Sequence, residues 1–461
     1  MRLPTYTTYK KVGDAWLGKV PKHWEIKRLK YLASVNDEAL PETTPPEFEL
    51  TYVDIGNVKS AEGIIADEQL TFDTAPSRAR RIVRDGDTIV STVRTYLRAI
   101  APIRKPPKNL IVSTGFAVVR PDKVQAPFLS YALRESSFVE TVVARSVGVS
   151  YPAINASEVG TIPIPLPESG EQRAIADFLD RETARLDTLV GKKRELIEKL
   201  KEKRTALISR TVTRGLPPDA ARAAGLTPHP KLKPSGIEWL GDIPQNWEVK
   251  ALKFVAVVGN GSTPSRDNAS YWDEGGYPWL NSSVVNKERV EGADQFVTDV
   301  ALAECHLPRI KPPAVLVGIM GEGRTRGMAT TLEIEATINQ HLAFVQPRSG
   351  RAEVGYLRRV FDTVYSFLRD ESDGGGSTKG AITCEQISSL KIPVPTISEQ
   401  SAIADYLDRE TAKLDRMMKK VEAVIEKLQE YRTTLITAAV TGKIDVRKAG
   451  QNRSDPPPLT D

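Results

Sequence analysis

One helix-like stretch occurs twice in this chain with almost no change. Residues 175–187 are IADFLDRETARLD and residues 403–415 are IADYLDRETAKLD, and the two differ only at Phe178/Tyr406 and Arg185/Lys413. Near-identity at this separation indicates that one supersecondary arrangement is built twice. Any fold for this chain must therefore contain two similar frames.

Other repeated segments show how large each frame is. A Trp-bearing segment, WLGKVPKHWEIKRLKYLASV (16–35), returns as WLGDIPQNWEVKALKFVAVV (239–258), and IPIPLPESGEQ (162–172) returns as IPVPTISEQ (392–400). Each unit thus has a Trp-bearing start, a domain, an Ile-Pro exit and a long helix. Between these shared ends, residues 36–160 and 259–390 hardly resemble each other, although both carry β-branched runs between Gly and Pro that predict strands. Constant frames with different contents suggest a scaffold that presents two different recognition domains.

The repeated helices have apolar residues at coiled-coil spacing. Alternating steps of four and three from Ile175 and from Ile403 meet mostly apolar residues, Leu189, Leu196, Met417, Val424 and Tyr431 among them. A helix that packs only on its own domain is the alternative. For the coiled coil, the predicted pairing residues are Leu179, Leu186, Leu200, Leu407, Leu414 and Leu428.

Connectivity predicts the direction of the helices. The segment GLPPDAARAAGLTPHPKLKPSG (215–236) is rich in Pro and Ala, and a short linker brings the end of the first helix near the start of the second. The pair should then be antiparallel, roughly 60 Å long at about 1.5 Å per residue, with an approximate two-fold axis of the kind that duplex DNA also has. The predicted fold is α+β: two globular recognition domains with β-sheet cores, joined by two long antiparallel helices that form a coiled coil. The predicted limits are 1–165 for the first domain, 166–214 for its helix, 215–236 for the linker, 237–395 for the second domain, 396–444 for its helix and 445–461 for a disordered tail.

Composition narrows the class of protein. The 461 residues are 40% hydrophobic and 27% charged, with no apolar run long enough for a membrane helix and no apolar secretion signal at the start. A cytoplasmic protein without a membrane partner is expected. The two cysteines, Cys305 and Cys384, have no metal-ligand spacing, so we expect ordinary thiols and no metal site.

Basic residues are concentrated in one part of the first domain. Residues 77–108 hold nine Lys and Arg against two Asp, while the whole chain has a net charge of only +5. Such a cluster favours a phosphate backbone through counterion release, and Arg can also bind guanine edges. A solvated surface or internal salt bridges are the alternative. The predicted DNA-binding residues here are Arg78, Arg80, Arg81, Arg94 and Arg98.

The second domain offers fewer cations but several polar side chains that could contact base edges. The predicted DNA-binding residues are Arg266, Asn268, Ser282, Arg324 and Arg326. The last two lie in GEGRTRG (321–327), which has neither dinucleotide-binding nor P-loop spacing, so a structural turn is the alternative. Four aromatic residues nearby are expected in the domain core, with base stacking as the other interpretation: Tyr271, Trp272, Tyr277 and Trp279.

No catalytic constellation can be assembled from the sequence. A DNA methyltransferase would need a cofactor-binding glycine loop and a tetrad of the N-P-P-Y type, and neither occurs. The E-x-K tripeptides at 25–27 and 248–250 suit a nuclease only with an upstream acid, which is Asp242 in one copy and Lys19 in the other. The four histidines are scattered. We therefore expect a non-catalytic chain without catalytic, cofactor-binding or metal-binding residues.

The whole chain resembles the specificity subunits of type I restriction–modification systems. The resemblance is carried by both Trp-bearing segments, by GSTPSRDNASYWDEGGYPWLNSS, and by EQRAIADFLDRETARLD with EQSAIADYLDRETAKLD. It implies two target recognition domains that read the halves of a bipartite, asymmetric double-stranded DNA target. It also implies two docked modification subunits that carry S-adenosylmethionine and methylate adenine N6, and restriction subunits that use ATP and Mg. A coiled-coil adaptor with protein-binding globular ends is the rival class.

Overall fold

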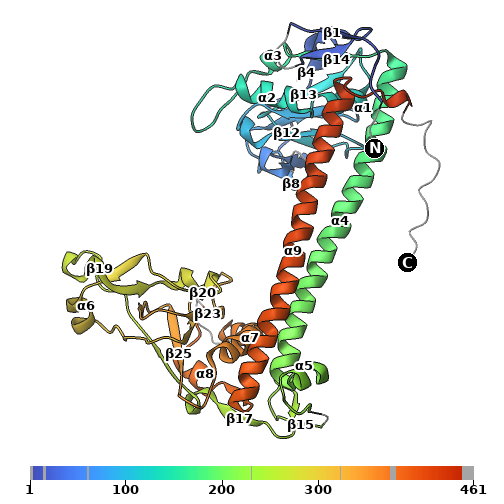
Figure 1. Cartoon of the computed structure of the whole chain (residues 1–461). Helices are drawn as coiled ribbons and strands as arrows, with labels where there is room; N and C mark the ends of the chain where they lie inside the picture. The colour runs from blue at the N-terminus through green and yellow to red at the C-terminus, as the bar shows by residue number, and fades with distance from the viewer. Residues whose placement is uncertain are drawn as a thin grey trace. The chain divides into compact units, whose positions relative to one another are not determined.

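The computed structural model describes residues 4–13, 17–59, 62–229, 231–321, 323–373 and 380–448. Two compact units result, one from residues 1–194 with 422–461 and one from residues 195–421. Trp16 of the repeated segment and residues 449–461 of the predicted tail lie outside the described residues. Figure 1 shows the elements.

Two long helices run through the chain, α4 (Ser169–Arg214) and α9 (Ile397–Val440). In the first unit the start of α4 and the end of α9 share one apolar cluster that contains Leu179 and Ala439. In the second unit the end of α4 and the start of α9 do the same through Val212 and Leu407. The helices are therefore antiparallel, as predicted, and they lie side by side (Figure 1). Both helices are followed by a glycine with positive φ, Gly215 and Gly442, the usual C-terminal cap.

The globular part of the first unit is built on two four-stranded sheets, ordered β11-β10-β13-β4 and β8-β5-β12-β9. The strands β10 and β12 have the sequences TIVS and LIVS and are buried throughout, as expected for β-branched runs. Ile89, Val112 and Phe116 belong to one buried cluster with residues of both sheets. The elements are β1 Tyr9–Lys11, β2 Lys19–Pro21, β3 Glu25–Arg28, β4 Ala33–Val35, β5 Glu49–Val53, β6 Val58–Lys59, β7 Gly63–Ile64, β8 Glu68–Thr71, β9 Ala79–Ile82, β10 Thr88–Ser91, η3 Thr95–Leu97, β11 Ile100–Pro102, β12 Leu110–Ser113, β13 Phe116–Pro121, α1 Ala126–Ala132, α2 Ser136–Ala144, α3 Ala156–Val159 and β14 Pro163–Leu166.

The second unit has a different sheet system inside the same frame. A five-stranded sheet has the order β18-β25-β22-β23-β20, and a three-stranded sheet has the order β21-β19-β24. The long helix α7 lies against β22 and β23 and buries Tyr356, Phe361 and Val364. The elements are α5 Pro218–Ala223, β15 Leu232–Pro234, β16 Asp242–Pro244, β17 Glu248–Ala251, β18 Ala256–Asn260, η5 Ala269–Tyr271, β19 Trp272–Leu280, η6 Ser282–Asn286, β20 Arg289–Val290, β21 Gln295–Val297, α6 Asp299–Glu304, β22 Ala314–Gly318, β23 Ala329–Leu332, β24 Thr337–Ile338, β25 Leu342–Pro347, α7 Val354–Asp373, α8 Cys384–Ser389 and β26 Lys391–Val394.

The frame itself is the same in both units. Antiparallel β3·β14 in the first unit corresponds to β17·β26 in the second, and β1·β2 corresponds to β15·β16. The segment 215–236, which we predicted as a linker, contains α5 and β15 and so supplies the second unit with the strand that residues 9–11 supply to the first. The α+β class with two sheet-containing domains is confirmed. The predicted domain limits stay predictions.

Candidate nucleic-acid interface

The repeated Trp meets a repeated Glu in each unit. In the first unit the Trp24 indole nitrogen donates to Glu171 Oε2 at 3.1 Å, and the Tyr6 hydroxyl donates to Glu171 Oε1 at 2.6 Å. All three residues are buried, and a buried carboxylate is stable only when donors satisfy it. Burial and the bond to Glu171 raise the pKa of the Tyr6 hydroxyl. This joint fixes the first residues of the domain to the start of α4.

The second unit contains the same joint with one substitution. Trp247 donates its indole N–H to Glu399 Oε2 at 3.1 Å, and His229 takes the place of Tyr6 beside the other carboxylate oxygen. Glu171 and Glu399 belong to the repeated sequence, whereas Tyr6 and His229 precede the repeated Trp segments. The residues that recur in both units therefore determine how each domain is attached to its helix.

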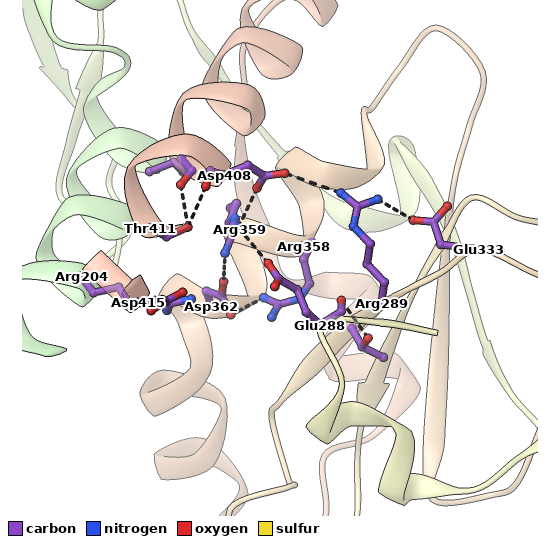
Figure 2. A network of polar contacts seen from close by, with 12 residues as sticks. Arg204, Glu288, Arg289, Glu333, Arg358, Arg359, Asp362, Asp408, Thr411 and Asp415 are labelled. Atoms are coloured by element: carbon purple, nitrogen blue, oxygen red, sulfur yellow. Dashed lines mark hydrogen bonds and ion pairs between the residues drawn. The ribbon is translucent and has the colours of Figure 1, made fainter. Parts of the chain in front are cut away.

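A second attachment uses a repeated Asp with domain-specific partners. In the first unit Asp180 of α4 accepts from Arg104 at 2.9 Å and from the Tyr131 hydroxyl at 2.7 Å. In the second unit Asp408 of α9 accepts from Arg359 at 2.6 Å and lies 3.7 Å from Arg289 (Figure 2). The same helix position thus holds two different domains in place.

Figure 2 also shows how the second domain surrounds this attachment. Arg359 is almost fully buried and pairs with Asp362 at 3.1 Å as well as with Asp408. Arg289 extends the network from β20 to Glu333 at 2.9 Å. Both the sheet and α7 are therefore tied to α9, which gives any recognition surface on the sheet a defined support.

The predicted DNA-binding residues of the first domain fall into two groups. Arg78, Arg80 and Arg81 lie on or beside β9, and the side chains of Arg78 and Arg80 have internal contacts. Arg78 donates to Asp54 at 2.8 Å and to the Tyr52 hydroxyl at 3.1 Å. The Arg80 guanidinium lies 4.3 Å from the centre of the Phe72 ring. Arg81 is only partly exposed. Internal pairing, the alternative interpretation of this cluster, accounts for part of its charge.

Arg94 and Arg98 form the other group. Both are exposed, they flank the short turn η3, and both have a φ of +53°, in the left-handed region that non-glycine residues rarely occupy. The Arg94 guanidinium lies over the Tyr151 ring, 4.9 Å from its centre. Arg98 pairs with Glu140 at 2.6 Å.

Three of the predicted residues of the second domain lie close to β19 in the sequence, and one of them, Arg266, packs on two aromatic rings. The Arg266 guanidinium lies 3.7 Å from the centre of the Trp272 ring and 5.1 Å from that of Trp279, and it donates to Gln295 at 2.7 Å. Asn268 accepts from the backbone N–H of Ser270 and thereby starts η5. Ser282 is partly buried at the start of η6. Of the four aromatic residues only Trp279 is fully buried; Tyr271, Trp272 and Tyr277 are half-buried around it.

The two arginines of GEGRTRG have different surroundings. Arg324 is exposed. Arg326 is buried and pairs with Asp373 at 2.5 Å, so its side chain holds the loop against α7. A buried and paired guanidinium of this kind is not accessible to a DNA phosphate.

The six predicted pairing leucines are buried or partly buried, but five other positions of the predicted seam are exposed. Leu179, Leu186, Leu200, Leu407 and Leu414 are buried, and Leu428 packs against the first unit's core. Leu189 and Leu196 are exposed, and the next residues, Val190 and Ile197, are buried instead. The same one-residue shift occurs on α9, where the exposed residues are Met417, Val424 and Tyr431 and the inward positions are held by Met418, Ile425 and Arg432.

Equivalent ion pairs fix the register of the helices in each unit. Arg432 donates to Asp187 at 3.0 Å in the first unit, and Arg204 donates to Asp415 at 3.1 Å in the second. Asp187 and Asp415 are the last residues of the two repeated stretches, so the pairing is antiparallel and follows the repeat.

Both E-x-K tripeptides form ion pairs on the protein surface. In each E-x-K tripeptide the Lys pairs with its own Glu on the surface, Lys27 with Glu25 at 2.7 Å and Lys250 with Glu248 at 2.5 Å. Lys27 lowers the pKa of Glu25, and Lys250 lowers that of Glu248. Within the described ranges, no group of three or more His, Cys, Asp or Glu could hold a metal ion. No helix of the described chain has the length and apolar character needed to cross a bilayer.

Comparison with known proteins identifies the family. The model of the type I restriction modification DNA specificity domain matches residues 21–199 and, a second time, residues 244–427. The chain belongs to this family. This chain is 24% identical over 453 residues to the MjaX type I restriction enzyme specificity subunit of Methanocaldococcus jannaschii, and the match covers 94% of this chain and 96% of that one.

Two further similarities agree with this assignment. The EcoR124I/EcoR124II specificity subunit of Escherichia coli is 26% identical over 164 residues, which are 35% of this chain and 40% of the relative. A chain from a structural study of complex assembly and conformational transition in the type I restriction–modification system superposes with a TM-score of 0.65 at 24% identity, over 92% of this chain and 99% of that one. The chain therefore recognises DNA through two specificity domains and is the non-catalytic specificity component of a type I restriction–modification system.

One group of surface residues was missed at the sequence level. Val147, Val149 and Tyr151 stand exposed between α2 and α3, next to Arg94. The signal in the sequence was three large apolar residues at alternate positions of the Gly- and Ser-containing stretch RSVGVSYP, a period of two that also fits a short strand.

Proposed function

We propose that each unit of this specificity subunit reads one half of a bipartite, asymmetric DNA target and that two modification subunits dock on the repeated frame. The different sheet systems support the first part, because different halves need different surfaces. The repeated joints and helices support the second, because two identical partners need two like surfaces.

The exposed seam neighbours carry the docking proposal. Leu189 and Leu196 on α4 correspond in the repeat to Met417 and Val424 on α9, and all four are exposed. Large apolar side chains left exposed at equivalent helix positions are typical of an interaction surface. The modification subunits would carry S-adenosylmethionine, and restriction subunits, with ATP and Mg, would complete a complex that works in the cytoplasm.

For DNA contacts we propose Arg78, Arg80, Arg81, Arg94 and Arg98 in the first domain and Arg266, Asn268, Ser282 and Arg324 in the second. The exposed arginines of this set are the most accessible to a phosphate backbone, and they are Arg78, Arg94, Arg98, Arg266 and Arg324. Two of them also pair with a carboxylate, Arg78 with Asp54 and Arg98 with Glu140.

Removing one docking surface at a time tests the proposal. The variants L189S/L196S and M417S/V424S change only exposed residues, so each chain should fold normally. We expect the wild-type chain to bind two modification subunits and each variant to bind one, as counted by native mass spectrometry. The exposed Lys192→Ser is the matched control on the same helix. Two bound subunits in both double variants would contradict the proposed surfaces.

A further inference from the structure

The loop between α2 and α3 carries an unusual amount of exposed apolar surface. Relative exposures are 81% for Val147, 102% for Val149 and 61% for Tyr151. Tyr96 and Leu97 of the adjacent turn η3 are exposed too. Five large apolar side chains therefore gather on two neighbouring segments of one domain, whereas surface apolar residues of a monomer are usually scattered.

This loop has a built conformation. Val147 and Ala153 exchange backbone hydrogen bonds of 2.9 and 3.0 Å, which close the tip into a narrow hairpin that projects between α2 and α3 (Figure 1). Ile154 N–H then donates to the Thr92 carbonyl at 2.9 Å, and Thr95 Oγ1 donates to Ser146 Oγ at 2.7 Å. The tip is thus anchored to the segment that carries η3.

Cations border the apolar tip. Arg94 stacks on Tyr151, and Arg98 is half-exposed even though it pairs with Glu140, the acidic neighbour on α2. Arg94 and Arg98 both hold the left-handed backbone conformation, which is costly for Arg and belongs to the kinds of backbone strain that cluster at functional sites. A projecting apolar tip with arginines at its base matches a DNA groove, where Arg meets phosphates and apolar side chains meet thymine methyls or base steps.

The repeat argues against a subunit contact at this tip. Docking surfaces should recur in both units, and base-reading surfaces should differ. The first unit has SVGVSYP directly before AINASEVGTIPIP, while the second has GGGSTKG before AITCEQISSLKIPVP, without one large apolar residue. The tip therefore belongs to the variable part of the chain.

We propose that the 147–151 tip is a base-contacting element of the first domain, with Val149 against the bases and Arg94 at the flanking phosphates. This inference rests on the proposed function, in which the first domain reads one half of the target.

The test compares apolar and charged variants in the assembled complex of this chain with its modification subunits. Binding is measured over a salt series on a duplex with the target, mapped beforehand from methylated adenines, and on an unrelated duplex. Val149→Ser should bind the target about tenfold more weakly, a loss typical of one base contact. Its affinity for unrelated DNA and its salt slope should not change, because no charge is lost. Arg94→Ala should weaken binding to both duplexes and lower the salt slope by about one.

Ile65→Ser is the matched control, since Ile65 is an exposed apolar residue of the same domain outside the tip. If Val149→Ser stays within twofold of the wild type on the target, or weakens binding to both duplexes equally, the tip does not contact bases. Failure of Val149→Ser to assemble with modification subunits would instead make the tip a protein contact and overturn the inference. A wild-type complex that binds its mapped target no better than unrelated DNA would overturn the proposed function, and this inference with it.

Discussion

At the scale of single residues, the residues that recur in both units attach each domain to its long helix. Their partners are residues that do not recur. Asp180 and Asp408 occupy the same place in the two repeats, yet one holds Arg104 and Tyr131 and the other holds Arg359 and Arg289. Domains with different sheets can therefore attach to the same helix position, as long as each places a hydrogen-bond donor beside the Asp.

Burial predicts that the two attachments differ in strength. The side chain of Arg359 is 4% exposed and that of Arg104 is 57% exposed. Asp408→Asn removes the nearest carboxylate from a buried guanidinium and leaves it Asp362 at 3.1 Å and the more distant Glu288 at 3.7 Å, so we expect a loss of about 2 kcal/mol in the free energy of unfolding. Asp180→Asn removes a solvated pair and should cost less than about 1 kcal/mol. Urea denaturation of the two variants measures both values, and equal losses would contradict this assignment.

The ion-pair partners of several cations could not be predicted from the sequence. Four of the cations counted in residues 77–108 pair with carboxylates from elsewhere in the chain: Arg78, Arg84, Arg98 and Arg104. Arg326 is likewise held by Asp373. Local charge counts predicted a basic region, but they could not predict partners that only the tertiary fold brings close.

At the scale of elements, periodicity predicted the two helices, five of their buried leucines and the partly buried Leu428. It could not choose between the adjacent apolar residues Leu189 and Val190, or between Leu196 and Ile197, because both choices fit a heptad. The structure buries Val190 and Ile197, and the pairs Asp187–Arg432 and Asp415–Arg204 have the same register. The different sheets of the two domains were predicted only as a class, since strand order depends on contacts distant in sequence.

The corrected seam gives a prediction with an adjacent control. Ile197→Ala removes buried methyl groups from the helix interface and should lower the free energy of unfolding by about 2 kcal/mol. Leu196→Ala, one residue away, changes an exposed side chain and should cost less than about 1 kcal/mol. Chemical denaturation of the chain without partners measures the difference. A larger loss for Leu196→Ala would restore the seam predicted from the sequence.

At the scale of the whole molecule, one chain carries two like frames and two unlike sheet domains. The duplication of Trp24–Glu171 in Trp247–Glu399 shows that the frame is copied down to its buried hydrogen bonds. Such a chain can present the same docking surface in both units. It can also present a different DNA-reading surface in each unit. The repeated frame thus serves assembly, and the two different domains serve DNA recognition.

Mapping N6-methyladenine across the genome measures whether the two domains specify different halves of one target, in cells with the modification subunit and either the wild-type chain or no chain. We predict methylation only with the chain, at a motif of two different specified halves separated by an unspecified gap. Methylation that persists without the chain, or a single uninterrupted motif, would contradict the account.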